Sequence, residues 1–186
     1  MTSPAASLNA ISDILEQTVC CLKPAETYNT PIQEYEHGFD DRRRLSYVSV
    51  KVQSDALDQG GEPTRDAGLW IRYASVRPGD ILCHVIPIKL GGPGYGHNVF
   101  PLNEKIDINE WNNAQDAVYN YLKESEDRYA YLQYGFVFDD KVDKRKMFHP
   151  VKVYYHFALH DKNGSVAQEL GGMLDNWKPV FVKRKI

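Results

Sequence analysis

The sequence has few cysteines, no long hydrophobic run and no excess of positive charge. It holds 3 cysteines, and Cys20 and Cys21 are adjacent, a spacing at which two cysteines rarely bond to each other. This pattern argues against a disulfide framework and leads us to expect a reducing compartment. No apolar run reaches the roughly 18 residues of a membrane-spanning helix, so no membrane partner is expected.

The charge balance excludes a protein that is coated with basic residues. The formal net charge is −3 at pH 7 and the pI is about 6.1, so any nucleic-acid site must be a local patch or a cleft that uses a metal ion. The amino terminus lacks the basic-then-apolar pattern of a signal peptide, and no arginine precedes Arg42. From these features we expect a cytoplasmic protein, or one exported without a signal peptide if it acts as an effector.

The chain does contain enough hydrophobic residues for a core. Its 186 residues fit one domain, or one domain with a small extension, and 42% of them are hydrophobic. A chain of this size buries about two-thirds of its unfolded surface. Neither disulfides nor a structural metal is therefore required for folding.

The first part of the chain predicts one helix followed by a polar segment. Hydrophobic residues fall at spacings of three and four over 7–22, where Ser7 can cap the helix. Residues 24–44 are rich in polar and turn-forming types and are predicted to run over the surface. We therefore predict an N-terminal helix and surface extension over 1–44 and a single domain over 45–186.

The rest of the chain alternates like a sheet, with one helix between strands. Strands are predicted over 45–53, 68–74, 81–88, 129–138 and 150–159, and a last strand near 165–170 follows a turn at 162–164. A second helix is predicted over about 108–124, with a buried stripe of Trp111, Ala114, Val118 and Leu122. Together these elements predict an α+β fold with a mainly antiparallel sheet and an N-terminal helix.

One histidine lies in an otherwise apolar strand. His84 is followed by a segment, 91–96, that contains four glycines and a proline. Such a histidine, taken alone, is usually a satisfied core residue. A zinc site with Cys83 and His97, or Cys83 as a nucleophile, is disfavoured because neighbours in a strand point to opposite faces and an apolar setting raises a thiol's pKa.

Residues 84–115 resemble the active-site segment of the DNA/RNA non-specific endonucleases, a family with the ββα-metal (His-Me finger) fold. His84 matches the family histidine, the run from Asn98 to Pro101 matches its Asn-x-x-Pro element, and Trp111 matches its helix tryptophan. The run NEWNN is similar to the endonuclease G branch, and the loop HVIP-x-x-LGGPG to small bacterial members, many of which are toxin domains. The resemblance extends over about 80–176.

The resemblance implies a role for each matched residue. His84 would be the general base that activates water, and Asn98 would orient the site by hydrogen bonds. Asp107 would hold Mg²⁺ or Mn²⁺ where the family has Asn, and the ion would clamp the scissile phosphate. Gln115 takes the position of a glutamate near the metal, with Asn109 beside it in the same helix.

Two of these residues also have a purely structural interpretation. Asp107 and Glu110 have the spacing of a capping box, and a residue at a helix start can both cap and bind. Asn98 can simply close the glycine-rich loop as a turn residue. The run Arg42–Arg44 is interpreted as a solvated charge run rather than as a phosphate contact.

The sequence also departs from the family. The Asp-Arg-Gly that precedes the family histidine is Ile81-Leu82-Cys83 here, so an arginine that faces the phosphate is missing. Arg77 and Arg72 precede the histidine strand, and we predict that Arg77 serves catalysis and Arg72 binds substrate in its place.

The predicted function is a metal-dependent endonuclease that cleaves DNA and/or RNA with little sequence preference. It would be a cytoplasmic nuclease or a toxin-type effector paired with an immunity or inhibitor protein. The alternative is a nuclease-fold protein without catalysis that binds nucleic acid or a protein. The replaced Asp-Arg-Gly and Gln115 favour this alternative, and the retained His84 opposes it.

Overall fold

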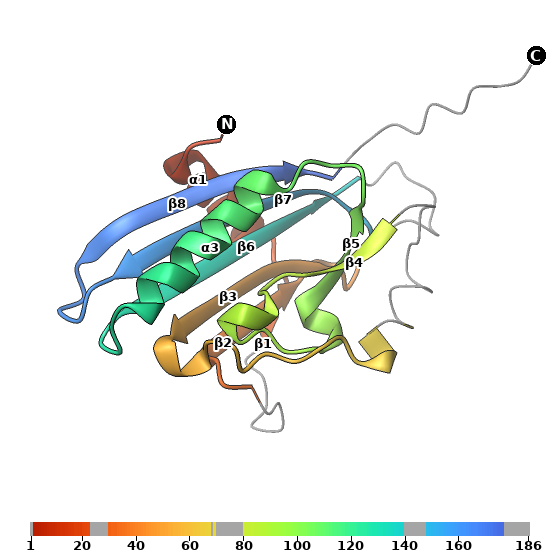
Figure 1. Ribbon diagram of the computed structural model, residues 1–186. Helices are drawn as coiled ribbons and strands as arrows, with labels where there is room; N and C mark the ends of the chain where they lie inside the picture. The colour runs from red at the N-terminus through yellow and green to blue at the C-terminus, as the bar shows by residue number, and fades with distance from the viewer. Residues whose placement is uncertain (1, 23–29, 68, 70–79, 140–147, 177–186) are drawn as a thin grey trace, which may run out of the picture.

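A six-stranded antiparallel sheet forms the centre of the molecule, and a helix covers each of its faces (Figure 1). The computed structural model describes residues 2–22, 30–67, 69, 80–139 and 148–176. The strand order is β1-β2-β3-β6-β7-β8, and a separate two-stranded sheet pairs β4 with β5. The predicted fold class, α+β with a mainly antiparallel sheet and an N-terminal helix, is confirmed.

The large sheet consists of β1 (Cys20–Leu22), β2 (Gln33–Phe39), β3 (Leu45–Gln53), β6 (Tyr129–Phe138), β7 (Pro150–His160) and β8 (Val166–Asp175). The small sheet consists of β4 (Asp80–His84) and β5 (Val99–Asn103), and the helices are α1 (Pro4–Glu16) and α3 (Asn109–Lys123). Short 3₁₀ turns lie at Ser54–Ala56, Ile88–Leu90 and Gly96–Asn98. The predictions for 45–53, 129–138 and 150–159 and for the second helix are confirmed.

The two helices lie on opposite faces because successive residues of a strand point to opposite sides. The ring of Tyr134 lies 5.5 Å from that of Trp111 in α3, whereas a Cβ added at its neighbour Gly135 would meet the side chain of Ile14 in α1. Trp111 also contacts Tyr155, with 5.2 Å between ring centroids. The aromatic core therefore lies between the sheet and α3.

The first helix begins earlier than the sequence predicts. Its N-cap is Ser3, whose Oγ accepts a hydrogen bond from Ala6 N, and Pro4 occupies the first helical position, where a missing N–H costs nothing. Ser7, the predicted cap, is instead an interior residue of α1. Its side chain is buried and donates a hydrogen bond to the carbonyl of Gly172 in β8. The helix ends at Glu16, and Cys20–Leu22 forms β1 rather than its last turn.

The predicted surface segment 24–44 contains a strand of the main sheet. Strand β2 pairs antiparallel with β3, so described residues on both sides of the predicted boundary at 44–45 belong to one sheet. The sequence of this strand, QEYEHGF, is mostly polar, so the hydrophobic pattern did not predict it. Arg44 is also not a solvated residue: it is buried, its Nε lies 2.6 Å from Asp40 Oδ2, and its guanidinium stacks over Phe138.

Strand β4 is shorter than predicted and ends at His84, because the chain turns at once into the 86–98 loop. Its partner β5 contains Pro101 and was not predicted, since proline is rare inside strands. The predicted strand over 68–74 and the basic tail lie outside the described residues, except for Leu69. The last strand, β8, is longer than the predicted 165–170.

Polar side chains attach the small sheet to the large one. Asn176, which follows β8, is buried; it donates to the carbonyls of Pro101 and Pro150 and accepts from Asn103 N. A buried pair of His149 and Asp80, with 3.3 Å between Nε2 and Oδ2, also joins β4 to the start of β7. These contacts fix the orientation of the β4–β5 pair on the molecule.

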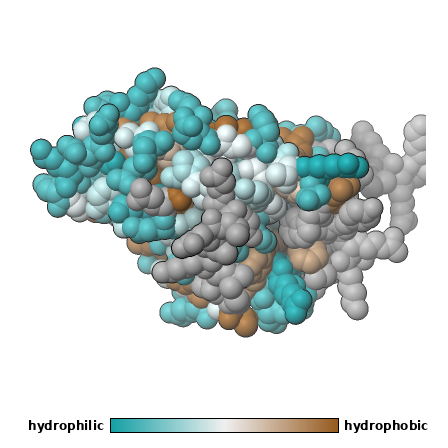
Figure 2. Space-filling view, turned by 90° about the horizontal axis from the view of Figure 1, so that it is seen from below, coloured by the Kyte–Doolittle hydropathy of each residue, from teal (hydrophilic) through white to brown (hydrophobic). Residues whose placement is uncertain are grey.

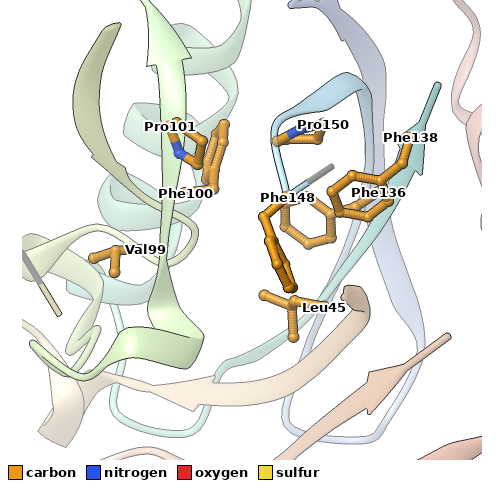
Figure 3. Close-up of a pocket in the computed structure, with 8 residues that line it drawn as sticks. All are labelled: Leu45, Val99, Phe100, Pro101, Phe136, Phe138, Phe148 and Pro150. Atoms are coloured by element: carbon orange, nitrogen blue, oxygen red, sulfur yellow. The ribbon is translucent and has the colours of Figure 1, made fainter. Parts of the chain in front are cut away.

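An apolar seam completes the junction between β5 and the large sheet (Figure 3). It is lined by Leu45, Val99, Phe100, Pro101, Phe136, Phe138, Phe148 and Pro150. The remaining space is about 10 Å³, which is at the lower limit for one water molecule, and the lining offers almost no polar partner. The seam is therefore part of the core and not a ligand site.

On the face of Figure 2, the apolar residues among those that the structure describes form small groups between polar ones. Among the described residues, the large hydrophobic side chains that are most exposed are Val19, Val166 and Ile81, from three different strands or turns. No helix in the described part of the chain is long and apolar enough to cross a membrane.

Candidate active site

His84 is the last residue of β4 and lies directly opposite Val99 of β5. The two residues share one face of the small sheet with Leu82, which packs against Val99 and Ala67 in a small cluster separate from the main core. Cys83 points to the opposite face and packs against the main core. The strand alternation thus turns His84 away from the core and towards the segment 60–67.

The imidazole of His84 is held by a backbone carbonyl. Its Nε2 lies 3.3 Å from the carbonyl oxygen of Gly61. Because a carbonyl oxygen only accepts hydrogen bonds, Nε2 carries the ring proton and Nδ1 keeps its lone pair. Burial lowers the pKa of His84, while the Gly61 bond and the carboxylate of Glu62 partly oppose that effect. The ring is therefore neutral at pH 7 and has one basic nitrogen.

The glycine-rich loop packs backbone against backbone on the segment that carries Gly61. Gly61 N donates to the carbonyl of Gly92 at 3.0 Å, and Thr64 N donates to the carbonyl of Gly94 at 2.8 Å. A Cβ at Gly94 would overlap the carbonyl oxygen of Glu62, and one at Gly92 would overlap that of Ile86. Only glycine leaves room for this approach, which places the Gly61 carbonyl beside His84.

Side chains of α3 brace the same loops from the other side. Lys89, in the 3₁₀ turn before the glycines, forms an ion pair with Asp116. Tyr119 donates to Asp58 Oδ2 at 2.8 Å. These contacts connect the helix to both segments that surround His84.

Asn98 is fully buried and its side chain is engaged in three hydrogen bonds. Its Oδ1 accepts from Ile86 N at 2.8 Å, and its Nδ2 donates to the carbonyls of Ile86 and Pro93, both at 2.9 Å. The amide therefore closes the loop between His84 and β5. Its side-chain oxygen and nitrogen are thus both bonded to backbone groups of the protein.

Two stacked imidazoles attach this loop to β2. The rings of His37 and His97 are 4.6 Å apart and nearly parallel, with an angle of 15°. His37 is buried, and burial together with the neighbouring His97 lowers its pKa to about 4. Burial also lowers the pKa of His97. Both rings are therefore neutral in the folded protein at pH 7.

Acidification is expected to destabilise the fold through His37. The unfolded chain takes up a proton on this residue below about pH 6.5, whereas the folded protein does so only near pH 4. The free energy of unfolding should therefore fall as the pH falls through this interval, by up to about 3 kcal/mol for a pKa difference of this size. Denaturant unfolding at pH 7.5 and 4.5 measures the change. His37→Phe keeps an aromatic ring and should lose part of this dependence; an unchanged dependence would contradict the assignment.

Asp107 lies in the turn between β5 and α3. Its side chain is exposed, and Oδ1 accepts from Asn109 N at 2.9 Å. The helix begins at Asn109, with Ile108 as its N-cap, so Asp107 forms a turn before the helix rather than the predicted capping box. Because His84 pairs with Val99 and Asp80 with Asn103, Asp107 follows the end of the small sheet that is opposite His84.

The two remaining predicted residues that the structure describes, Gln115 and Asn109, both belong to α3. Gln115 is buried on the core side, next to the hydroxyl of Tyr134. Burial raises the pKa of Tyr134, and the neighbouring Cys83 raises it further. Asn109 is exposed in the first turn of α3. Arg72 and Arg77 lie outside the described residues.

Cys83 is unsuited to nucleophilic chemistry. Burial raises the pKa of its thiol to about 12, and its Sγ donates to the carbonyl of His84 at 3.4 Å. A thiol with this pKa is protonated at neutral pH and is a poor nucleophile and metal ligand. Within the described residues, no group of three or more His, Cys, Asp or Glu side chains comes together for a metal ion.

The sequence alone did not point to Gly61, Glu62 or His37. Gly61 lies 23 residues before the histidine it contacts, in a loop with no periodic pattern. The one available signal was the pair Gly60-Gly61, whose lack of side chains permits close backbone approach.

Comparison with solved structures shows that the fold is that of known nucleases. An "extracellular endonuclease" matches with a TM-score of 0.55 and 11% identity, covering 84% of this chain and 83% of that one. An "extracellular nuclease" matches with a TM-score of 0.50 and 12% identity, covering 85% and 90%. The "Sda1 nuclease with bound zinc ion" matches with a TM-score of 0.53 and 10% identity, covering 81% and 76%. No protein-family model and no curated protein matches the chain by sequence. The resemblance to the non-specific endonucleases is thus confirmed at the level of the fold.

The expectation of a cytoplasmic protein is wrong in the light of these comparisons, because two of the similar structures are extracellular nucleases. The cysteine pattern, which led us to expect a reducing compartment, does not distinguish the two compartments. Cys83, the one cysteine whose side chain the structure describes, is unpaired, and burial raises the pKa of its thiol, so the thiol is protonated and weakly reactive at neutral pH. An unpaired cysteine of this kind is compatible with an oxidising compartment as well.

Proposed function

We propose that this protein is a metal-dependent endonuclease that hydrolyses phosphodiester bonds of DNA and/or RNA, with His84 as the general base. The observation that carries the proposal is the state of His84: a neutral imidazole at a strand end, fixed through Nε2 by the Gly61 carbonyl, with a basic Nδ1. The order of β4, the glycine-rich loop, β5 and α3 supports a ββα-metal motif. The nuclease fold supports the class of reaction.

The proposed reaction needs one proton acceptor in a fixed position. Nδ1 of His84 takes a proton from water, and the water oxygen forms a bond to phosphorus. The bond from phosphorus to the 3′ oxygen breaks, and that oxygen takes a proton from solvent. His84 then releases its proton to solvent and returns to its neutral state. Asn98 and the glycines keep the ring in place throughout.

Asp107 is the proposed ligand for a divalent ion, and Mg²⁺ or Mn²⁺ is the proposed metal. Its exposed carboxylate fits a cation that keeps most of its waters and takes one or two protein oxygens. The ion, when bound, would supply positive charge to the bound phosphodiester backbone, at the end of the small sheet that is opposite His84. Arg77 and Arg72 remain proposed contacts to the phosphate, and Gln115 and Asn109 remain proposed outer residues of this site.

Cleavage is expected to need a divalent metal ion. Plasmid DNA and total RNA would be incubated with the protein in Mg²⁺, in Mn²⁺ and with EDTA, and product formation followed on gels. Asp107→Ala should abolish most cleavage, whereas Asp107→Asn, which restores the family residue and keeps an oxygen for Asn109 N, should retain it. Equal activity of the two variants would show that the ligand lies elsewhere. A folded wild type without cleavage would support the alternative, a catalytically inactive protein that binds nucleic acid or a protein.

A toxin-type effector, neutralised by an immunity or inhibitor protein, is the biological form that we propose. It is supported by the similarity of the loop HVIP-x-x-LGGPG to small bacterial members of the family. This proposal requires cleavage activity, and it is excluded if the folded protein does not cleave nucleic acid.

A further inference from the structure

Glu62 follows the residue that holds the proposed base. The carbonyl of Gly61 contacts His84 Nε2, so the next residue along the chain lies at the edge of the imidazole. The side chain of Glu62 is exposed, whereas the backbone around it is fixed by the Gly61–Gly92 and Thr64–Gly94 hydrogen bonds. The backbone position of Glu62 relative to His84 is therefore set by these contacts, and its carboxylate extends from a fixed point of the chain.

The charge of Glu62 reaches the imidazole. Its carboxylate raises the pKa of His84 against the larger lowering effect of burial. No other charged side chain in the described part of the chain acts on this ring in the same way. The hydrogen bond to the Gly61 carbonyl and, after it, the Glu62 carboxylate thus oppose the desolvation of the imidazolium.

The proposed reaction places a positive charge on His84, which the negative charge of Glu62 would stabilise. When Nδ1 takes the proton of the attacking water, the half-buried ring becomes a cation, and burial disfavours that charged form. A carboxylate nearby stabilises the cation and makes the neutral ring a stronger base.

We propose that Glu62 is a positioning residue of this site, whose carboxylate faces His84 and stabilises the imidazolium formed when His84 accepts the proton of water. This inference rests on the proposed role of His84 as general base. The placement of Glu62 against His84 can nevertheless be tested without any cleavage.

The test measures the pKa of His84 directly. Protein labelled with ¹⁵N-histidine would be titrated by NMR, with the His84 signals assigned by their loss in His84→Gln. In Glu62→Gln the pKa of His84 should fall, because the neutral amide no longer stabilises the cation. Asp66→Asn, which removes an exposed carboxylate four residues further on, is the matched control and should leave it unchanged. Far-UV circular dichroism of each variant confirms that it is folded.

The same variants would be assayed for cleavage across the pH range. In Glu62→Gln the acidic limb of the profile should move to lower pH, and the plateau rate should fall about 3- to 10-fold. An unchanged pKa of His84 in Glu62→Gln would overturn the inference, whatever the activity. A lowered pKa with an unchanged plateau rate would overturn the catalytic role. If the wild type cleaves nothing, the proposed function fails, whereas a lowered pKa would still support the placement of Glu62.

Discussion

Replacement of His84 by alanine is expected to lower the rate of metal-dependent cleavage by about 10²- to 10⁴-fold, the range that a positioned general base contributes. The loss arises because Nδ1 of His84 is the proposed acceptor of the water proton. The fold should survive, since the side chain is only half-buried and its one described hydrogen bond is to the Gly61 carbonyl. Initial rates on plasmid DNA and total RNA, with thermal unfolding of each variant, measure both effects.

The matched control is His160→Ala. His160 lies at the end of β7, where it stacks on Tyr129 and contacts the Gly164 carbonyl, next to the β7–β8 turn. This variant loses an imidazole of similar exposure and should cleave at the wild-type rate. Cleavage by His84→Ala at the rate of the control would mean that the base lies elsewhere in the molecule.

Replacement of Asn98 by alanine should lower the stability of the fold strongly. It removes the partners of Ile86 N and of the Ile86 and Pro93 carbonyls, all in a buried setting. Each buried group without a partner costs about 1–3 kcal/mol, so a loss of at least about 3–4 kcal/mol is expected for the three groups. For a chain of this length that corresponds to a decrease in Tm of about 5–15 °C, measurable by calorimetry.

Two further variants make this result specific. Asn112→Ala, at an exposed position of α3, changes the same residue type and should alter the Tm little. Asn98→Asp keeps the acceptor for Ile86 N but places a carboxylate against two carbonyl oxygens, so it should be at least as unstable as Asn98→Ala. A wild-type Tm in both Asn98 variants would refute the hydrogen-bonding scheme.

The sequence predicted the elements with strong periodicity and missed those without it. Strands β3, β6 and β7 alternate over nine or more residues, and α3 carries a continuous apolar stripe, so packing and local pattern agree. Strand β2 is polar on its outward positions, and β5 has only five residues, one of them a proline. Both form strands because they pair with a neighbouring strand, β2 with β3 and β5 with β4. Local propensity carries no information about such pairing.

The candidate site was predictable in part for a similar reason. His84 and Asn98 lie in one segment with a recognisable spacing, and the structure shows how the amide of Asn98 closes the loop after His84. The Gly61 carbonyl and Glu62 come from a distant segment, and the contact is made by backbone atoms, which leave no sequence signature. The burial of Gln115 beside Tyr134 likewise depends on how α3 is rotated on the sheet.

The backbone-on-backbone packing at Gly92 and Gly94 also determines where this protein tolerates mutation. At these positions an alanine would collide with a carbonyl oxygen rather than with a movable side chain, so no neighbouring substitution relieves it. Exposed positions of the same loops, such as Glu62, are free of this constraint. A library that randomises the loops for new cleavage preferences should therefore keep these glycines and vary the residues between and around them.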